Sequence, residues 1–147
     1  NLIMCNVVAP NGDYWFSGLG VERYDPDTQQ FKSYTKDNGK LPTRGIAILY
    51  FDWKGTLWAG GREILCRYNP QKDAFEEVLQ GHFNKRVQLI EQIDATHLMV
   101  GDMQSLHVID LKHLDEKGNE VVKIISLKKR PNNTETKAPN TPIPMAS

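Results

Sequence analysis

Short apolar and aromatic runs alternate with polar turns through most of this chain. Each run spans about four to eight residues, is rich in Ile, Val, Tyr, Phe and Trp, and is bounded by Gly, Pro, Asn or Asp, as β-strands are. No stretch before residue 128 repeats its apolar residues at the helical spacing. The pattern predicts an all-β fold. The predicted strands are 2–8, 14–17, 21–25, 29–34, 46–52, 56–60, 64–69 and 74–79.

The same order of residues occurs twice, and a weaker third version follows. Trp15 recurs as Trp58 after 43 residues, and Tyr24 recurs as Tyr68 after 44 residues. In the third copy Met99 stands in the place of the Trp. A repeat of this length, made of four strand-sized runs, indicates a β-propeller blade. The runs of the third copy are 87–94, 97–101, 106–110 and 121–125.

The repeat predicts a β-propeller fragment of about three four-stranded antiparallel blades, at 1–37, 44–80 and 86–127, the third degenerate. Residues 128–147 hold four of the eight prolines, and we expect a disordered tail or linker there. Three blades are too few to close a ring, and repeat units need neighbours to cover their faces. The expected partners therefore include the remaining blades of a larger propeller, or other copies of this chain by self-association.

Turns of similar sequence lie at equivalent positions in the first two repeats and support the assignment of blades. Asn11-Gly12 and Lys54-Gly55 lie between the first and second runs, and the former predicts a two-residue turn of type I′ with both residues at positive φ. Asp25-Pro26 and Asn69-Pro70 lie between the third and fourth runs, where Pro presets φ and the Asx side chain bonds the backbone.

Charge and apolar run length exclude two classes of partner. Residues 1–127 carry 14 basic and 17 acidic side chains, so the blades lack the basic excess that nucleic-acid binding requires. No apolar run approaches the roughly 18 residues of a membrane span. We therefore expect neither nucleic-acid binding nor membrane insertion by this segment.

No motif for a metal, a cofactor or catalysis stands out. Cys5 and Cys66 each lie in an apolar run and are expected to be small buried thiols, although the sequence leaves their pairing open. The four histidines are scattered, and there is no phosphate-binding loop or dinucleotide fingerprint. We expect no cofactor, no metal and no catalytic residues.

A propeller's topology places certain loops on one face. The loops between blades share a face with the loops between second and third strands, and loops on rigid scaffolds often carry function. The arginines among them suit bidentate contact with a carboxylate such as that of a uronic acid. The alternative is that these are ordinary solvated charges. The candidate ligand-binding residues there are Arg44, Arg62, Glu63, Arg86, Asp102 and Gln104.

The recurring aromatic residues are interpreted as packing between blades. Trp53 breaks the repeat, because the first copy has Pro10 at its position. It is a further candidate, for stacking on a sugar ring, with an ordinary exposed turn residue as the alternative. The packing set comprises Trp15, Trp58, Tyr24, Tyr68, Phe31 and Phe75.

These residues resemble the two-component regulator propeller repeat. Its pattern is Gly-x-x-Trp-x-x-Gly, then Arg-Tyr-Asp/Asn-Pro, then Phe, and it covers residues 1–80 well and 87–127 poorly. The first copy supplies Gly12, Trp15, Gly18, Arg23, Tyr24, Asp25, Pro26 and Phe31. The second supplies Gly55, Trp58, Gly61, Arg67, Tyr68, Asn69, Pro70 and Phe75, with Asp52 also fitting where the first has Ala9.

The resemblance implies a periplasmic or extracytoplasmic location. Such repeats form paired seven-bladed propellers in the sensors of hybrid two-component systems of gut bacteria, where they bind glycan fragments and signal to a histidine kinase. The implied function is non-enzymatic ligand sensing, with an oligosaccharide or other small ligand as partner and a histidine kinase as the parent protein. The alternatives are a scaffold for protein–protein interaction and a polysaccharide lyase or hydrolase built on a propeller.

Overall fold

Twelve strands form three four-stranded antiparallel sheets in the computed structural model, which describes residues 3–114 and 121–126. This confirms the predicted all-β fold of three blades; the predicted tail at 128–147 lies outside the described residues. Blade 1 contains β1 (Cys5–Val8), β2 (Tyr14–Ser17), β3 (Val21–Asp25) and β4 (Gln30–Tyr34). Blade 2 contains β5 (Ile46–Phe51), β6 (Leu57–Gly61), β7 (Ile64–Asn69) and β8 (Ala74–Val78). Blade 3 contains β9 (Leu89–Asp94), β10 (His97–Gly101), β11 (Ser105–Asp110) and β12 (Val121–Ser126), with a 3-10 turn, η1, at Leu111–His113.

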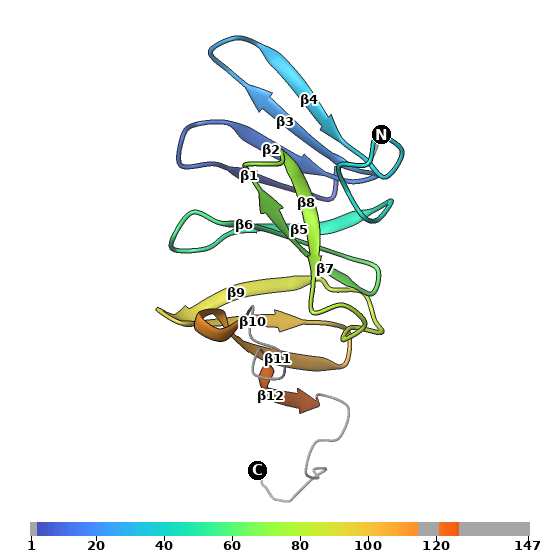
Figure 1. The fold of residues 1–147 in the computed structure, drawn as a ribbon, viewed down its shortest axis with the longest axis vertical. Coiled ribbons are helices and arrows are strands. Elements are labelled where there is room, and N and C mark those ends of the chain that lie inside the picture. The colour runs from blue at the N-terminus through green and yellow to red at the C-terminus, as the bar shows by residue number, and fades with distance from the viewer. Residues whose placement is uncertain (1–2, 115–120, 127–147) are drawn as a thin grey trace, which may run out of the picture.

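The three blades lie one on another along the long axis of the molecule (Figure 1). Within each blade the strands follow chain order across the sheet. The first strands contact one another across the blades, β1 with β5 and β5 with β9. This is the arrangement of neighbouring propeller blades, in which the first strand of each blade lies nearest the ring axis.

Each seam between two blades contains its own apolar core. Trp15 and Tyr34 of blade 1 pack with Phe75 of blade 2, and all three side chains are buried. Trp58 of blade 2 packs with blade 3 residues, among them Leu98. Burying large rings removes much apolar surface from water, so these seams hold the stack together.

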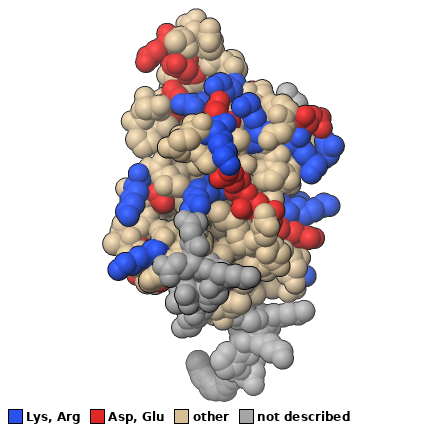
Figure 2. Space-filling view, viewed as in Figure 1, with Lys and Arg blue, Asp and Glu red and all other residues tan. Residues whose placement is uncertain are grey.

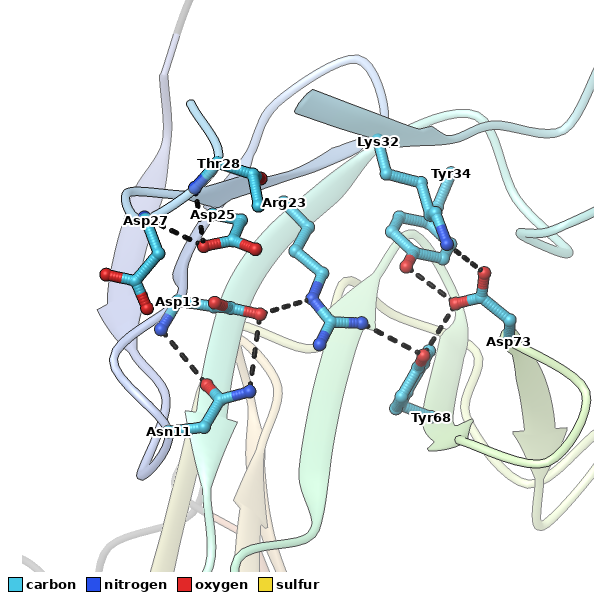
Figure 3. A network of polar contacts seen from close by, with 10 residues as sticks. All are labelled: Asn11, Asp13, Arg23, Asp25, Asp27, Thr28, Lys32, Tyr34, Tyr68 and Asp73. Carbon is cyan, nitrogen blue, oxygen red and sulfur yellow. Dashed lines mark hydrogen bonds and ion pairs between the residues drawn. The ribbon is translucent and has the colours of Figure 1, made fainter. Parts of the chain in front are cut away.

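A polar network crosses the seam between blades 1 and 2 (Figure 3). The Asp73 carboxylate accepts hydrogen bonds from the hydroxyls of Tyr34, at 2.7 Å, and Tyr68, at 2.6 Å, and from Lys32 Nζ, at 2.7 Å. Burial opposes ionisation of Asp73, but these three donors outweigh it and hold its pKa well below the usual range. Arg23 Nη1 also donates to the Tyr68 hydroxyl, at 3.5 Å. The network fixes the fourth strand of one blade against the next blade.

The turns between first and second strands differ from the predicted type I′ geometry. Gly12 N–H bonds to the Ala9 carbonyl, at 2.9 Å, and of the Asn11-Gly12 pair only Gly12 has a positive φ, 95°. Gly55 bonds to the Asp52 carbonyl in the same way, with φ of 85°. Each is a four-residue turn, 9–12 or 52–55, that is closed by the backbone N–H of a left-handed glycine. The fixed negative φ of Pro10 suits the second position of the first turn, and Trp53 occupies that position in the second turn.

Phe31 and Tyr24 depart from the prediction that all six recurring aromatic residues pack between blades. The Phe31 side chain is 67% exposed, and the half-buried Tyr24 ring contacts Tyr14 and Phe31 within blade 1. Trp15, Trp58 and Phe75 are buried, and Tyr68 is half-buried against blade 1. No blade covers the side of blade 1 that carries Phe31 among the described residues, which is the physical reason for the exposure.

Both cysteines are free thiols. Cys66 is fully buried, and burial raises the pKa of its thiol to about 12. Cys5 is half-buried, and its sulfur accepts a hydrogen bond from the Leu49 backbone N–H at 3.4 Å. Cys66 is thus the buried small hydrophobe that was expected, whereas Cys5 is less buried than predicted.

Candidate functional site

The loops that topology assigns to one face meet there through backbone hydrogen bonds. Ile46 N–H donates to the Gly18 carbonyl, at 3.0 Å, and Val87 N–H donates to the Gly61 carbonyl, at 2.9 Å. Glu63 N–H donates to the Lys85 carbonyl, at 3.2 Å. The end of a second strand is thus tied to the loop that enters the next blade, and the same contact recurs at both seams.

A hollow of about 350 Å³ opens on this face between blades 1 and 2. It takes Arg44 from the loop between the blades, Arg62 from the β6–β7 turn and Arg86 from the loop that leads to blade 3. We call it the arginine hollow. Its other lining residues are Met4, Gly18, Leu19, Thr43, Gly45, Ile46, Ala47 and Gly61.

Carboxylates of the chain occupy the three guanidinium groups of the hollow only weakly. Arg44 Nη1 lies 3.4 Å from Asp37 Oδ1, but the two side chains are 73% and 81% exposed, so this ion pair is weak. Among the described residues, no carboxylate pairs with Arg62 or Arg86. The hollow is therefore a concave, cationic surface open to an anionic ligand. Elsewhere, acidic and basic side chains are interspersed on the face seen in Figure 2.

The apolar half of the hollow was missed by the sequence interpretation. Met4 and Leu19 are 48% and 80% exposed, and with Ile46 and Ala47 they line the hollow beside the arginines. The sequence held no signal for them, because singly exposed apolar residues are ordinary on protein surfaces.

Three other candidate residues lie on the same face but outside the hollow. Glu63 occupies the β6–β7 turn with φ of 57°, and its side chain is exposed. Asp102 and Gln104 lie in the β10–β11 turn of blade 3. The Asp102 carboxylate accepts from the Gln104 N–H, at 2.7 Å, and the Ser105 N–H, at 2.8 Å. These two hydrogen bonds use the Asp102 carboxylate to stabilise the β10–β11 turn.

Asp102 also ends a chain of side chains that the sequence did not indicate. Its carboxylate lies 3.1 Å from His107 Nε2, and His107 Nδ1 lies 2.9 Å from His82 Nε2. Burial opposes ionisation of Asp102, but the bonds from Gln104, His107 and Ser105 hold its pKa below the usual value. His82 and His107 are 25 residues apart, so only the seam between blades 2 and 3 brings them together.

Trp53 lies away from these groups. It is 63% exposed in the β5–β6 turn, which is at the opposite end of β6 from Arg62. Its backbone N–H donates to Gln92 Oε1 at 2.7 Å. Trp53 therefore lies outside the arginine hollow.

Two further features of the described residues bear on the class of site. No group of three or more His, Cys, Asp or Glu side chains there is placed to hold a metal ion. In the same part of the chain, no helix has both the length and the apolar character needed to cross a membrane.

Extracellular domains of proposed one-component and hybrid two-component systems share this fold. The extracellular domain of BT4673 from B. thetaiotaomicron, a proposed one-component system, superimposes with a TM-score of 0.69 at 20% identity over 80% of this chain. That of BT3049, a proposed hybrid two-component system of the same organism, gives 0.65 at 16% identity over 83%. The chain spans 17% and 16% of those two domains. The predicted resemblance to sensor propellers is confirmed for the fold.

The same fold also occurs in another setting. U3-55K superimposes with a TM-score of 0.63 at 16% identity, over 84% of this chain and 38% of its own. No protein-family model and no curated protein matches the sequence. The fold is thus shared across functions, and the function must be argued from the site.

Proposed function

We propose that this chain is a non-enzymatic, ligand-sensing part of an extracytoplasmic sensor propeller, and that the arginine hollow binds an acidic oligosaccharide. The observation that carries the proposal is the convergence of Arg44, Arg62 and Arg86, from three separate loops, on one hollow. The similarity to extracellular domains of proposed two-component systems supports a sensing role and an extracytoplasmic location. The parent protein would then be a hybrid histidine kinase.

The lining of the hollow favours a ligand with both an acid group and an apolar ring face. Guanidinium groups bind carboxylates through two parallel hydrogen bonds. The apolar side chains of Met4, Leu19 and Ile46 offer a surface for the C–H face of a sugar ring. A uronic acid residue combines these two features, so an oligogalacturonide is the probe of choice.

The test is calorimetric titration with an oligogalacturonide and with a neutral oligosaccharide of the same length. We expect the acidic sugar to bind, with affinity that falls as salt screens the charges, and the neutral sugar not to bind. Hydrogen bonds to charged groups contribute about 1.5–3 kcal/mol each, so Arg44→Ala or Arg86→Ala is expected to weaken binding roughly tenfold or more.

Lys54→Ala serves as the control, because it removes an exposed cation from the β5–β6 turn at the other end of blade 2. It is expected to leave the affinity unchanged. Equal binding of the acidic and the neutral sugar, or an Arg44→Ala/Arg86→Ala double variant that binds like the unaltered chain, would contradict the proposed site.

A further inference from the structure

Two histidine rings meet at the seam between blades 2 and 3. His107 projects from β11 and is 5% exposed, whereas His82 belongs to the 79–88 loop between β8 and β9 and is half-buried. The rings meet edge-on, with centroids 4.9 Å apart, and Phe83 packs against both, at 4.8 Å and 4.9 Å. Phe83 is part of the apolar core of this seam, so the hydrogen bond between the histidines lies at the edge of that core.

Packing alone does not require a histidine at this place on β11. Val100 and Ala59 hold the same place in their repeats, and across the hairpins they pair with His107 and Cys66 respectively. Cys66 is fully buried in the apolar core between blades 1 and 2. A small hydrophobe thus fills the position at one seam, and the titratable ring at the other seam calls for a further role.

The Asp102 carboxylate fixes where the protons of the histidines lie. It accepts from the N–H groups of Gln104 and Ser105 through Oδ1, and its Oδ2 lies 3.1 Å from His107 Nε2. Burial opposes ionisation of Asp102, but these bonds hold its pKa below the usual value, so the ionised carboxylate only accepts. Neutral His107 therefore carries its proton on Nε2 and turns the lone pair of Nδ1 toward His82. His82 must then donate from Nε2, across 2.9 Å.

This chain of hydrogen bonds tolerates one added proton but not two. After one proton is added, either ring can carry the charge, because one N–H still faces one lone pair. A second proton places an N–H group and a positive charge on both sides of the 2.9 Å contact. Histidine ordinarily changes its charge between pH 5 and pH 8. Acidification is therefore expected to open the contact between the rings.

Charged side chains of both signs lie on the loops and strands around the two histidines. Asp102 bonds directly to His107, so we expect it to have the largest effect on how the pair takes up protons. The cations of the 79–88 loop oppose a second positive charge there. The charged residues on these surrounding elements are Glu63, Arg67, Glu76, Lys85, Arg86 and Asp102.

The loop that carries His82 also carries Arg86, which lines the arginine hollow. Two backbone bonds hold this part of the loop against the β6–β7 turn: the Lys85 carbonyl accepts at 3.2 Å, and the Val87 N–H donates at 2.9 Å. The bond to His107 holds the same loop on its other side, against blade 3. Opening the contact between the histidines therefore releases one side of the loop that positions Arg86.

We propose that His82, His107 and Asp102 form a proton-sensitive latch, which holds the 79–88 loop and thereby Arg86 in place at neutral pH and releases the loop on acidification. The consequence for ligand binding rests on the proposed function: the affinity of the arginine hollow for an acidic sugar falls as the second proton binds. His82 and His107 are positioning residues, because they act on the ligand through Arg86.

Nuclear magnetic resonance of the chain without ligand tests the latch itself. The ring nitrogens are expected to show that neutral His82 and neutral His107 are both protonated on Nε2. The two rings are expected to titrate in two separate steps between pH 8 and pH 4.5, because they share one hydrogen bond. The backbone signals of Lys85 and Arg86 are expected to move with the second step.

Two substitutions alter the latch in opposite ways. Asp102→Asn keeps one oxygen for the turn but points an N–H₂ group at His107, which reverses the chain of hydrogen bonds, so that the first added proton opens it. Its neutral rings are expected to be protonated on Nδ1, and its loop signals to move at a higher pH. His82→Gln keeps an N–H group where Nε2 stood and can turn its oxygen toward a protonated His107, so its loop signals are expected to stay fixed.

The matched control is His97→Gln, because it removes a histidine that is bound to Asp94 at the other end of blade 3. Its ring and loop signals are expected to follow those of the unaltered chain.

Calorimetric titration with the oligogalacturonide then connects the latch to the hollow. We expect the affinity of the unaltered chain to fall several-fold between pH 8 and pH 4.5, by no more than the loss caused by Arg86→Ala. The sugar carboxylates stay largely ionised over this range, since carboxyl groups titrate near pH 4 or below. The affinities of His82→Gln and of Arg86→Ala are expected to stay constant over the same range.

Three results would overturn the proposal. The first is a set of loop signals that stay fixed in the unaltered chain between pH 8 and pH 4.5. The second is an Asp102→Asn variant whose loop moves at the same pH as that of the unaltered chain. The third is a pH dependence of the affinity that persists in full in Arg86→Ala. An oligogalacturonide that fails to bind at every pH, while the loop signals move as expected, would contradict the proposed ligand and support the latch.

Discussion

At the scale of single residues, buried carboxylates decide how this chain holds its turns and seams. Asp52 is the example within a blade. Its Oδ1 accepts from the N–H groups of Lys54 and Thr56, and its Oδ2 accepts from Trp58 Nε1 at 2.9 Å. One side chain therefore closes the turn and fixes the ring that fills the next seam. The first copy of the repeat has Ala9 at this position, so blade 1 lacks this arrangement.

Asp52→Asn tests this role. The new amide keeps one oxygen for the turn but turns an N–H₂ group toward the Trp58 N–H, which leaves a buried donor without an acceptor. We expect a loss of about 1–3 kcal/mol in the free energy of unfolding, measured with urea. Asp37→Asn, at an exposed site, is expected to change it little, and equal effects of the two substitutions would contradict the assigned role.

Asp73 and Asp102 give the stability a defined dependence on pH. Both have folded-state pKa values below those of the unfolded chain, where a carboxyl titrates near 3.9. The unfolded state therefore takes up protons first on acidification, so their contribution is complete above about pH 5 and is lost as the pH falls toward the folded pKa values.

The expected result is a fall in the free energy of unfolding between roughly pH 5 and pH 2, shallower in Asp73→Asn than in the unaltered chain. Urea unfolding at a series of pH values measures it. Asp73→Asn is also expected to be less stable at pH 7, because it loses the ionised acceptor for Lys32. A slope that is the same in both proteins would show that Asp73 is not a source of the pH dependence.

At the scale of elements, the blades are joined by close contact between backbones. Gly61, at the end of β6, accepts from Val87 as that chain enters blade 3. A Cβ on Gly61 would collide with the Gly45 carbonyl oxygen, where β5 is about to begin. The glycine is therefore required by space, since its backbone does not lie in the left-handed region.

Gly61→Ala is expected to destabilise the chain by about 1–3 kcal/mol, because the obstacle is backbone and cannot move aside as a side chain would. Gly45→Ala is the control, since the nearest atom to its added Cβ, the Gly18 carbonyl oxygen, is at an ordinary contact distance of 3.6 Å. Thermal unfolding followed by circular dichroism compares the two. A milder effect at Gly61 than at Gly45 would refute the steric account.

At the scale of the whole molecule, the arginine hollow follows from the stacking of blades. It exists only where loops of two blades meet, and Phe31 is exposed because the first blade has no neighbour among the described residues. A repeat protein places equivalent surfaces at regular intervals, so one covered surface shows what its uncovered equivalent requires.

The sequence by itself determined the blades. Alternation of apolar runs with Gly, Pro and Asx turns, and the return of Trp15 and Tyr24 as Trp58 and Tyr68, predicted three four-stranded sheets, because strand pairing and turn geometry depend on neighbouring residues. The repeat also predicted which loops share a face, since strand direction alternates along a meander. Arg44, Arg62 and Arg86 were named on that ground, and the structure brings them together.

Only the tertiary structure decided which side chains meet across the seams. It places Trp53 away from the arginines and brings Asp102 into contact with His107. It also leaves Phe31 exposed, although Phe31 occupies the same position in the repeat as the buried Phe75. The physical reason is that a seam forms between residues about 40 positions apart, as Tyr34 and Asp73 do. Burial at such a position depends on whether a neighbouring blade is present, which a local pattern does not encode.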